Sequence, residues 1–592
     1  MATITKESVS QQEVLRQRIP FVVIGLLIVC GVLVMRLISF QFPQDPRVMA
    51  EFAALRDANY GTIQRLEAPR GRIYDRSGNP LAVNTREYRV GISPNVVSNK
   101  AQVAQQLAMI LNRDELEMYN MLMSNSSYEL LGVVSPDVWR QLDQLGLYAL
   151  RVERVQRRLY PQGTLASQLV GFVAGVGEDA SGYNGVEGYY QAELAGLVRD
   201  QEVSNIPFEL GDNVVQLNSG ADLVLTIDRD IQFLAETHLQ LAISETGASG
   251  GTIIVMNPTN GDILGMASYP TYDPNRYFDF DQRELRNPAI SDTFEPGSVF
   301  KVITMAAALD SGAITPDWTY NDQAEYVIGG IRIRNWDRQA YGVVNATQVL
   351  VDSLNVGTAV IAREEMGWET FYRYVDRFGF GRLTRVDMQG EEAGLLRTPT
   401  SSEWSESDLG TNSFGQGMLV TPLQMLTAVN AIANGGLMMQ PRIVHQKIEG
   451  DQIQTSRVAA LGRPISAETA AAMTDMMVAA VRDGLDERAQ VPGYTIAGKT
   501  GTAQIWGVVD YLPDAFIMSV AGFLPADDPQ VSVLIKLDRP TSGRWASQVV
   551  APVFSRFVSR LVDLLEIPTD EVRYALVRDG ATGATVAEEG RP

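Results

Sequence analysis

A serine and a lysine one helical turn apart are the side chains in this sequence best suited to covalent chemistry. Ser298 and Lys301 follow Pro296-Gly297 and lead into Val302–Leu309, a run of good helix formers. Because residues three apart on a helix share a face, the lysine amine can lie beside the serine hydroxyl, and a desolvated lysine can take the serine's proton. The first turn of a helix also offers free backbone N–H groups to a developing oxyanion. The spacing therefore predicts acyl transfer, with Ser298 as the nucleophile and Lys301 as the base.

The amino-acid composition argues against the commoner kinds of catalytic and metal site. The chain has two histidines, His238 and His445, which lie far apart in the sequence, and a single cysteine, Cys30. A histidine-based triad or zinc site is therefore hard to build, and an intrachain disulfide is impossible. We expect no metal and no cofactor. The formal net charge of −21 also argues against a nucleic-acid partner, which needs a basic face.

Lysine is scarce in this chain, which makes each lysine informative. Of the 49 lysines and arginines only six are lysines, and arginine cannot give up its proton in a protein. Besides Lys301, one of the six opens the segment Lys499-Thr500-Gly501-Thr502, which abuts an apolar stretch. The segment Ser353-Leu354-Asn355 lies between Lys301 and Lys499 in the sequence, in a region of helical pattern. Each motif is common alone, but the three in this order match the signature of class A β-lactamases and penicillin-binding proteins.

The segment Gly493–Thr500 also fits the phosphate-binding pattern G-x-x-x-x-G-K-[ST]. A P-loop needs a buried strand before it and a helix that opens at the lysine. The polar stretch Asp486–Pro492 is no buried strand, and Gly501 and Pro513 interrupt any helix that would follow. We therefore reject a nucleotide site and expect this segment to form part of a strand.

The elements that must hold these residues follow a pattern of two strands, a long insertion and three further strands. Asp228 is placed to cap a helix, and Pro258–Asp262 has the composition of a hairpin turn. The expected elements are a strand at 223–227, a helix from 228 to about 246, strands at 252–256 and 263–268, a mostly helical region at about 298–485, strands at 494–497 and beyond, 516–523 and 531–537, and a helix at 549–565. We predict an α+β catalytic domain with one five-stranded antiparallel sheet flanked by helices.

One apolar stretch lies near the amino terminus. Ile19–Met35 holds 17 uncharged, mostly apolar residues, and Leu37–Phe40 extends it, which is near the lower limit for spanning a bilayer. No small-residue cleavage site follows, so we expect an uncleaved anchor, and basic residues before it favour an amino terminus inside the cell. The predicted parts are a cytoplasmic tail at 1–18, a transmembrane anchor at 19–40, an elongated mixed α/β pedestal domain at 41–220, the catalytic domain at 221–568 and a partly disordered tail at 569–592.

With these motifs in place, the chain resembles a class B penicillin-binding protein, a peptidoglycan D,D-transpeptidase, over nearly its whole length. Segments outside the catalytic motifs are also similar to the family: Arg70–Arg76 with Gly78, Leu81 and Ala82, Gly185–Gly188, Asn257-Pro258, Thr421–Gln424 and Ala551-Pro552. The sequence Ser353–Gly357 is more similar to the septal, cell-division type than to the elongation type. Two departures are Leu354, where the family commonly has serine, and the segment after Leu194-Ala195-Gly196, where the family's glycine-punctuated stretch is not recognisable.

The resemblance implies a role for each residue of the first two motifs. Ser298 would attack the carbonyl of the penultimate D-Ala in a D-Ala-D-Ala stem peptide, and Lys301 would accept the serine proton. Ser353 would relay a proton to the leaving amine, and Asn355 would hydrogen-bond the backbone of the donor peptide. An amino group of a neighbouring stem peptide would then take the acyl group, which forms the cross-link.

The resemblance implies that the third motif binds the substrate. Lys499 would supply positive charge, and Thr500 and Thr502, with Gly501 between them, would hold the terminal carboxylate. The backbone N–H groups of Ser298 and Thr502 would form the oxyanion hole. β-Lactams would acylate the same serine and stall there.

The resemblance also implies a place in the cell and a set of partners. The catalytic domain would lie outside the cytoplasmic membrane, where stem peptides and β-lactams reach it. The pedestal would serve dimerisation or the docking of a membrane glycosyltransferase polymerase and other cell-wall synthesis proteins. Other functions stay open: a D,D-carboxypeptidase or β-lactamase that hydrolyses its acyl-enzyme at the same site, or a non-catalytic β-lactam sensor or division scaffold.

Overall fold

The computed structural model describes residues 5–41, 61–175, 180–196, 198–204, 219–484, 487–507 and 510–576. The chain forms two compact units, one from residues 1–67 and 198–217 and the other from residues 68–197 and 218–592. Parts of the expected pedestal domain at 41–220, chiefly residues 42–60 and 205–218, lie outside the described residues. So does most of the expected tail, although residues 570–576 are helical.

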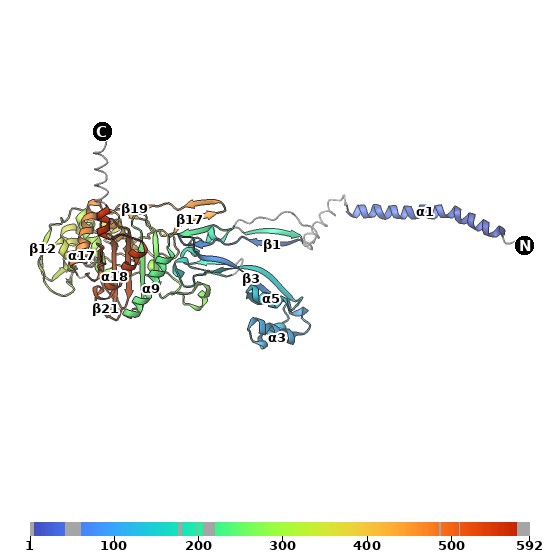
Figure 1. The fold of residues 1–592 in the computed structure, drawn as a ribbon, viewed down its shortest axis with the longest axis horizontal. Coiled ribbons are helices and arrows are strands. Elements are labelled where there is room, and N and C mark those ends of the chain that lie inside the picture. The colour runs from blue at the N-terminus through green and yellow to red at the C-terminus, as the bar shows by residue number, and fades with distance from the viewer. Residues whose placement is uncertain are drawn as a thin grey trace, which may run out of the picture. The chain divides into compact units, whose positions relative to one another are not determined.

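The smaller unit contains the apolar segment expected near the amino terminus. α1 (Thr5–Gln41) is a single helix, and its stretch Arg18–Ile38 has 21 residues, a mean hydropathy of 2.9 and no buried portion. Among the described residues, it is the one helix long and apolar enough to cross a bilayer, which agrees with the predicted anchor. The unit also contains β1 (Gly61–Glu67), which pairs antiparallel with β8 (Val198–Ser204) (Figure 1).

The larger unit begins with a sheet built around one long strand. That strand, β3 (Pro80–Ile92), pairs antiparallel with three others: β2 (Ile73–Tyr74), β4 (Glu129–Val134) and β5 (Leu150–Leu159). Val90 and Ile92 share a buried apolar cluster with residues of the neighbouring helices. These and the shorter elements of this part are η1 (Pro94–Val96), α3 (Lys100–Leu111), α4 (Glu115–Leu122), α5 (Pro136–Asp143), α6 (Ser167–Val170), β6 (Phe172–Ala174), β7 (Ser181–Tyr183), α7 (Gly185–Tyr189) and α8 (Gln191–Ala195).

The same sheet also contains strands from distant parts of the sequence. β9 (Asp222–Leu225), the strand expected at 223–227, pairs parallel with β2 and antiparallel with β17 (Val444–Glu449). β18 (Gln452–Thr455) extends the sheet as the antiparallel neighbour of β17. Segments so far apart in the sequence pair only through the tertiary structure, so the catalytic and pedestal parts of this unit share one sheet.

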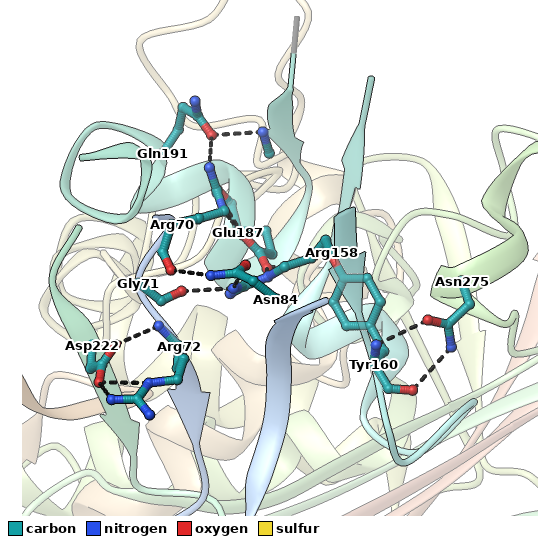
Figure 2. Close-up of polar contacts among 11 residues, drawn as sticks. Arg70, Gly71, Arg72, Asn84, Arg158, Tyr160, Glu187, Gln191, Asp222 and Asn275 are labelled. Carbon is teal, nitrogen blue, oxygen red and sulfur yellow. Dashed lines mark hydrogen bonds and ion pairs between the residues drawn. The ribbon is translucent and has the colours of Figure 1, made fainter. Parts of the chain in front are cut away.

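A buried ion-pair network joins the two pedestal segments that resemble the family. Glu187 has no exposed side-chain area and accepts hydrogen bonds from Arg70 Nη2 at 2.5 Å and Arg158 Nε at 2.6 Å (Figure 2). Arg158 Nη1 also donates to the Gly71 carbonyl oxygen at 2.7 Å. Burial alone would raise the pKa of Glu187, but Arg158 and Arg70 hold it below the ordinary glutamate value. Because a buried carboxylate needs charged partners, the two segments fix each other in the fold.

The catalytic domain is built on one antiparallel sheet of five strands in the order β11-β10-β22-β21-β20, which confirms the prediction. The strands are β10 (Gly250–Met256), β11 (Ile263–Tyr269), β20 (Ala497–Trp506), β21 (Tyr511–Leu524) and β22 (Val531–Asp538). β10 and β11 form the expected hairpin. β20 lies at one edge of the sheet, with β21 as its hydrogen-bonded neighbour.

Helices cover both faces of this sheet. α9 (Arg229–Thr246) and α18 (Ala546–Leu564) lie against one face of the sheet (Figure 1). They share a buried cluster with Ile253 and Val255 of β10. α11, α16 and α17, whose bounds follow, share the cluster on the other face with Ile254 and Met256. Because successive side chains of a strand point to opposite faces and helices cover both faces, β10 is buried throughout. The sheet is therefore the middle layer of three.

The insertion between β11 and β20 is less helical than predicted. Its helices are η3 (Pro274–Asp279), α10 (Pro288–Ser291), η4 (Gly297–Phe300), α11 (Lys301–Asp310), α12 (Ala346–Val351), α13 (Asn355–Val360), η5 (Ile361–Met366), α14 (Gly367–Arg377), α15 (Glu406–Asn412), α16 (Pro422–Ala433), α17 (Ala467–Asp483) and η6 (Glu487–Ala489). Besides β17 and β18, it holds six short strands: β12 (Thr319–Asp322), β13 (Glu325–Ile328), β14 (Ile331–Arg334), β15 (Gly342–Asn345), β16 (Met438–Met439) and β19 (Ala460–Gly462). The strands are only two to four residues long and, apart from the buried β16, largely exposed. They therefore show little of the apolar alternation that reveals a strand in a sequence.

Candidate active site

The predicted nucleophile lies at the start of a buried helix. The 3-10 turn η4 runs directly into α11, so Ser298 is in the first turn, as predicted. Gly297 has a φ of +55°, a left-handed conformation that favours glycine. A Cβ at this position would lie only 3.0 Å from the carbonyl oxygen of Thr502. The turn thus packs closely against β20. Ser298 is half-buried and lines the adjoining cavity.

The predicted base is desolvated and joins the first motif to the second. Lys301 has no exposed area. Its amine donates hydrogen bonds to the carbonyl oxygen of Ser353 at 2.6 Å and to Ser353 Oγ at 3.2 Å. The two residues are 52 positions apart in the sequence, so the fold brings together the pair that the motif order suggested.

Ser353 lies in the turn between two helices, and Asn355 is the first residue of the second helix. The turn separates α12 from α13, whereas the sequence placed them only within a helical region. Ser353 has a φ of +57°, and a non-glycine residue in this left-handed region costs about 1–2 kcal/mol. Asn355 Nδ2 donates to the Arg334 carbonyl oxygen at 3.0 Å, which leaves its amide oxygen as an acceptor. Leu354, the departure from the family pattern, is fully buried in the core and points away from the cavity.

The third motif lies on the edge strand β20, beside the nucleophile turn. Lys499 and Thr500 are 1% and 6% exposed. Thr502 Oγ1 accepts a hydrogen bond from the Ala546 backbone N–H at 2.9 Å, so its hydroxyl hydrogen can donate elsewhere. A Cβ on Gly501 would lie 2.8 Å from the Pro296 carbonyl oxygen. The strand passes through the Lys-Thr-Gly motif without a helix, which confirms that this segment is not a P-loop.

A single cavity of about 270 Å³ gathers most of the predicted residues. It is lined by Ser298, Ser353, Asn355, Lys499, Thr500 and Thr502, and also by Gly297, Trp336, Phe414, Gln416, Trp545, Ala546, Ser547 and Gln548. Two predicted residues are not part of the lining: Lys301 lies behind Ser353, and Gly501 packs against the nucleophile turn. The roles predicted for all eight residues remain proposals.

Two tryptophans in the cavity wall had no signal in the sequence. Trp336 and Trp545 come from loops on either side of the third motif in the chain, and their ring centroids are 5.2 Å apart at an interplanar angle of 74°. Trp336 Nε1 also donates to the Asp352 carbonyl oxygen at 3.1 Å, next to Ser353. A lone tryptophan in a loop has no periodic spacing to a motif, so only the tertiary structure reveals this pair.

A half-buried acid, Glu295, lies three residues before the predicted nucleophile. The side chain of Glu295 accepts hydrogen bonds from the Gly417 backbone N–H and from the Tyr511 hydroxyl. Burial raises the pKa of Glu295 above its usual range, although both hydrogen bonds oppose the rise. The pKa of Tyr511 is also raised, by burial and by the Glu295 carboxylate, so the phenol keeps its proton and remains a donor.

The described part of the chain offers no constellation for a metal ion. Within those ranges, no group of three or more histidine, cysteine, aspartate or glutamate side chains is placed to hold one. The polar groups of the cavity are instead hydroxyls, amides and the Lys499 amine. Such a set suits a substrate that carries a carboxylate and peptide groups.

Models of two protein families match this chain. The penicillin-binding protein transpeptidase domain matches residues 251–559, and the penicillin-binding protein dimerisation domain matches residues 65–205. The first match spans every catalytic motif described above. The second spans β2 to β5 and the buried network around Glu187.

Individual proteins and solved structures are similar over most of their length. Stage V sporulation protein D of Bacillus subtilis is 33% identical over 556 residues, which cover 91% of this chain and 84% of that protein. Peptidoglycan D,D-transpeptidase FtsI of Escherichia coli K12 is 28% identical, with 86% of each chain covered. The crystal structure of penicillin-binding protein 3 from Mycobacterium tuberculosis in complex with aztreonam superposes with a TM-score of 0.66 at 28% identity, covering 86% of this chain and 98% of that one.

Proposed function

The chain belongs to the class B penicillin-binding protein family, and on that premise we propose that it is a peptidoglycan D,D-transpeptidase that works through an acyl-serine intermediate. It cross-links stem peptides during cell-wall synthesis. Its similarity to FtsI and to stage V sporulation protein D supports the septal type. The observation that carries the proposal is the arrangement of the three motifs: Ser298, Ser353 and Lys499 line one cavity, and buried Lys301 bonds Ser353 directly behind it.

Acylation begins at the first turn of α11. Ser298 Oγ attacks the carbonyl carbon of the penultimate D-Ala, and its proton passes to the amine of Lys301 in its neutral form. The carbonyl oxygen becomes an oxyanion that accepts hydrogen bonds from the backbone N–H groups of Ser298 and Thr502. One such donor is typically worth about 2.7–4 kcal/mol of barrier. The close contact between the nucleophile turn and β20 supports this oxyanion hole, because the two segments that carry these N–H groups lie side by side.

Collapse of the tetrahedral intermediate breaks the C–N bond to the terminal D-Ala. The leaving nitrogen takes a proton, which Ser353 relays from the Lys301 amine through the 3.2 Å contact. The free D-Ala departs and leaves an ester on Ser298. An amine of a neighbouring stem peptide then attacks that ester, gives its proton back along the same route, and releases Ser298 with the cross-link formed.

Substrate recognition depends on β20. Lys499 supplies positive charge to the terminal carboxylate of the donor. Thr500 and Thr502 donate hydroxyl hydrogen bonds to the same carboxylate, and Thr502 can do so because its oxygen already accepts from the Ala546 N–H. The amide oxygen of Asn355 accepts from a backbone N–H of the donor peptide, because its Nδ2 is held by the Arg334 carbonyl oxygen.

Labelling with a fluorescent penicillin followed by peptide mass spectrometry tests this function. A β-lactam acylates the nucleophile and stalls, so we expect one stable adduct on the peptide that contains Ser298, and none in Ser298→Ala. Ser547→Ala is a matched control, because Ser547 also lines the cavity and should label normally. An adduct on another residue, or full labelling of Ser298→Ala, would overturn the assignment.

A second assay separates cross-linking from hydrolysis. The purified full-length chain is given a D-Ala-D-Ala peptide with and without an amine acceptor, and the products are separated by mass. A transpeptidase consumes the acceptor and forms the linked product. Release of free tetrapeptide at an unchanged rate when the acceptor is present would instead identify a carboxypeptidase.

The position in the cell follows from α1. We infer a single-pass anchor with the amino terminus inside and the catalytic domain outside the cytoplasmic membrane, supported by the apolar stretch Arg18–Ile38 and the basic residues before it. The pedestal is the docking part for a membrane glycosyltransferase polymerase and other cell-wall synthesis proteins, supported by the match to a dimerisation domain. Protease added to intact cells should degrade the catalytic domain if this orientation is right.

A further inference from the structure

The carboxylate of Glu295 connects three segments that surround the nucleophile. It lies three residues before Ser298. Its Oε1 accepts the Gly417 backbone N–H at 2.9 Å and the Tyr511 hydroxyl at 3.0 Å, and the same hydroxyl lies 3.2 Å from Oε2. Gly417 belongs to the loop after α15, and Tyr511 is the first residue of β21. One side chain therefore fixes a loop and a strand to the segment that carries the nucleophile.

The strand that binds the substrate needs such a fixation, because it is an edge strand. β20 carries Lys499, Thr500 and Thr502, and the sheet holds it from one side through β21. On its other side it meets the nucleophile turn through Gly501 and Gly297, which lie close to backbone atoms of the opposite segment. This contact through the two glycines is steric, and it sets how closely the two segments can approach.

The link between Glu295 and Tyr511 adds a hydrogen bond between the strand pair and the nucleophile segment, at the end of the strand pair. Tyr511 pairs in register with Trp506, the last residue of β20, and the two rings meet edge to face with centroids 4.8 Å apart. The hydroxyl of Tyr511 then reaches Glu295, on the nucleophile segment. The strand pair is thus attached to that segment beyond the glycine contact.

The loop before α16 is tied to the same point. The Gly297 backbone N–H donates to the Gly415 carbonyl oxygen at 3.0 Å, and the Gly417 N–H donates to Glu295. Gln416, between the two glycines, lines the cavity. Glu295 therefore also sets where this wall of the cavity lies relative to Ser298.

We propose that Glu295 is a positioning residue of the acyl-transfer site: through Tyr511 and Gly417 it sets the separation between the nucleophile turn and the strand that carries Lys499, Thr500 and Thr502. The inference rests on the acyl-serine function proposed above. Burial raises the pKa of Glu295, whereas its two hydrogen-bond donors favour the ionised form. The Gly417 N–H and the Tyr511 hydroxyl therefore also hold the acid in place. It does not contact the reacting atoms in this scheme, and its effect reaches the reaction through geometry.

Acylation kinetics of the full-length chain in detergent test the proposal. The rate of labelling by a fluorescent penicillin is measured against its concentration, which separates the acylation rate constant from the initial binding constant. Glu295→Ala removes both hydrogen bonds, and we expect its acylation rate constant to fall about tenfold or more, the rate equivalent of about 1.4 kcal/mol, while initial binding changes little. Glu295→Gln keeps an acceptor oxygen at the same place and should recover most of the rate.

A double-substitution cycle identifies the partner. Tyr511→Phe alone should slow acylation, whereas adding it to Glu295→Ala should slow the reaction by less than about twofold more, since coupled residues do not add. Glu449→Gln, on an exposed strand end, is the matched control and should react like the parent chain. Thermal melting shows what fraction of each variant is folded, and a purely structural role would lower that fraction without changing the rate constant of the folded part.

The outcomes distinguish this proposal from the function on which it rests. Absence of any adduct on Ser298 in the parent chain would overturn the proposed function. A normal adduct in the parent chain with an unchanged rate constant in Glu295→Ala, or with fully additive effects of Glu295→Ala and Tyr511→Phe, would overturn the positioning role alone. Failure of Glu295→Gln to recover any rate would also count against it, because the acceptor oxygen is retained.

Discussion

Replacing Gly501 by alanine is expected to push the substrate-binding strand away from the nucleophile. A Cβ at this position would lie 2.8 Å from the Pro296 carbonyl oxygen, 2.9 Å from Val299 Cγ2 and 3.0 Å from the Val299 nitrogen. Two of these three atoms are backbone atoms of the nucleophile turn, which cannot rotate aside. The strand or the turn must therefore move.

The size of the movement follows from the same distances. Ordinary contact begins at 3.4 Å, so the methyl group of Gly501→Ala requires a shift of about 0.6 Å, and overpacking of this kind typically costs about 1–3 kcal/mol of stability. A misplacement of about 1 Å in an active site can cost about a hundredfold in rate. For the smaller shift we expect the acylation rate to fall about tenfold, because the N–H groups of Ser298 and Thr502 that form the proposed oxyanion hole would no longer converge on one oxygen.

The measurement is the rate of penicillin labelling, with a second glycine of the same strand as its control. A Cβ on Gly498 would lie 3.3 Å from the flexible Val481 Cγ2, and its other neighbours are at 3.5 Å and 3.7 Å. Gly498→Ala should therefore label at nearly the parent rate and melt at nearly the parent temperature. If Gly501→Ala also labels at the parent rate, or if Gly498→Ala is the slower of the two, the packing argument is wrong.

Two further substitutions test other parts of the fold. Ser353→Ala and Ser353→Gly should both slow acylation by about 10²–10⁴-fold, the usual contribution of a proton-transfer group. Ser353→Gly should nevertheless melt at a higher temperature than Ser353→Ala, because a left-handed φ of +57° costs non-glycine residues about 1–2 kcal/mol. Equal melting temperatures would contradict this. Glu187→Ala should destabilise the chain by about 3–5 kcal/mol in thermal or denaturant unfolding, because Arg70 and Arg158 are left buried without their carboxylate, while Ser298 of the folded fraction still labels. The pKa of Glu187 is held below its ordinary value of 4.5, so its stabilising effect is present at neutral pH and is lost as the pH falls through that lowered pKa. If acid lowers the stability of the parent chain no more than that of Glu187→Ala, the reasoning is wrong.

The candidate residues of the site could be named from the sequence because their signals are local. Ser298 and Lys301 are one helical turn apart, and Pro296-Gly297 marks where the turn begins, so their relation needs no knowledge of the rest of the fold. The same holds for the hairpin of β10 and β11 and for the apolar strand β22, whose composition and length mark them in the sequence. The order of the three motifs then indicated which segments must meet.

Other features of the site could not be predicted because they depend on contacts between distant segments. Trp336 and Trp545 meet in the cavity wall although neither belongs to a motif. Tyr511 reaches Glu295 across 216 positions of the sequence. The left-handed backbone of Ser353 was hidden as well, because a serine between two helical patterns carries no sign of its φ angle.

The sequence by itself determined which groups are candidates for the reaction: a serine, a scarce lysine and a Lys-Thr-Gly segment, in an order that allows acyl transfer and leaves little room for histidine or metal chemistry. The tertiary structure decided how far apart those groups lie and what else surrounds them. The physical reason is that a side chain's chemistry and its periodic spacing are properties of the local chain. The distance between Ser298 and an edge strand two hundred residues later is set by the packing of glycines, the hydrogen bonds of Glu295 and the helices on both faces of one sheet.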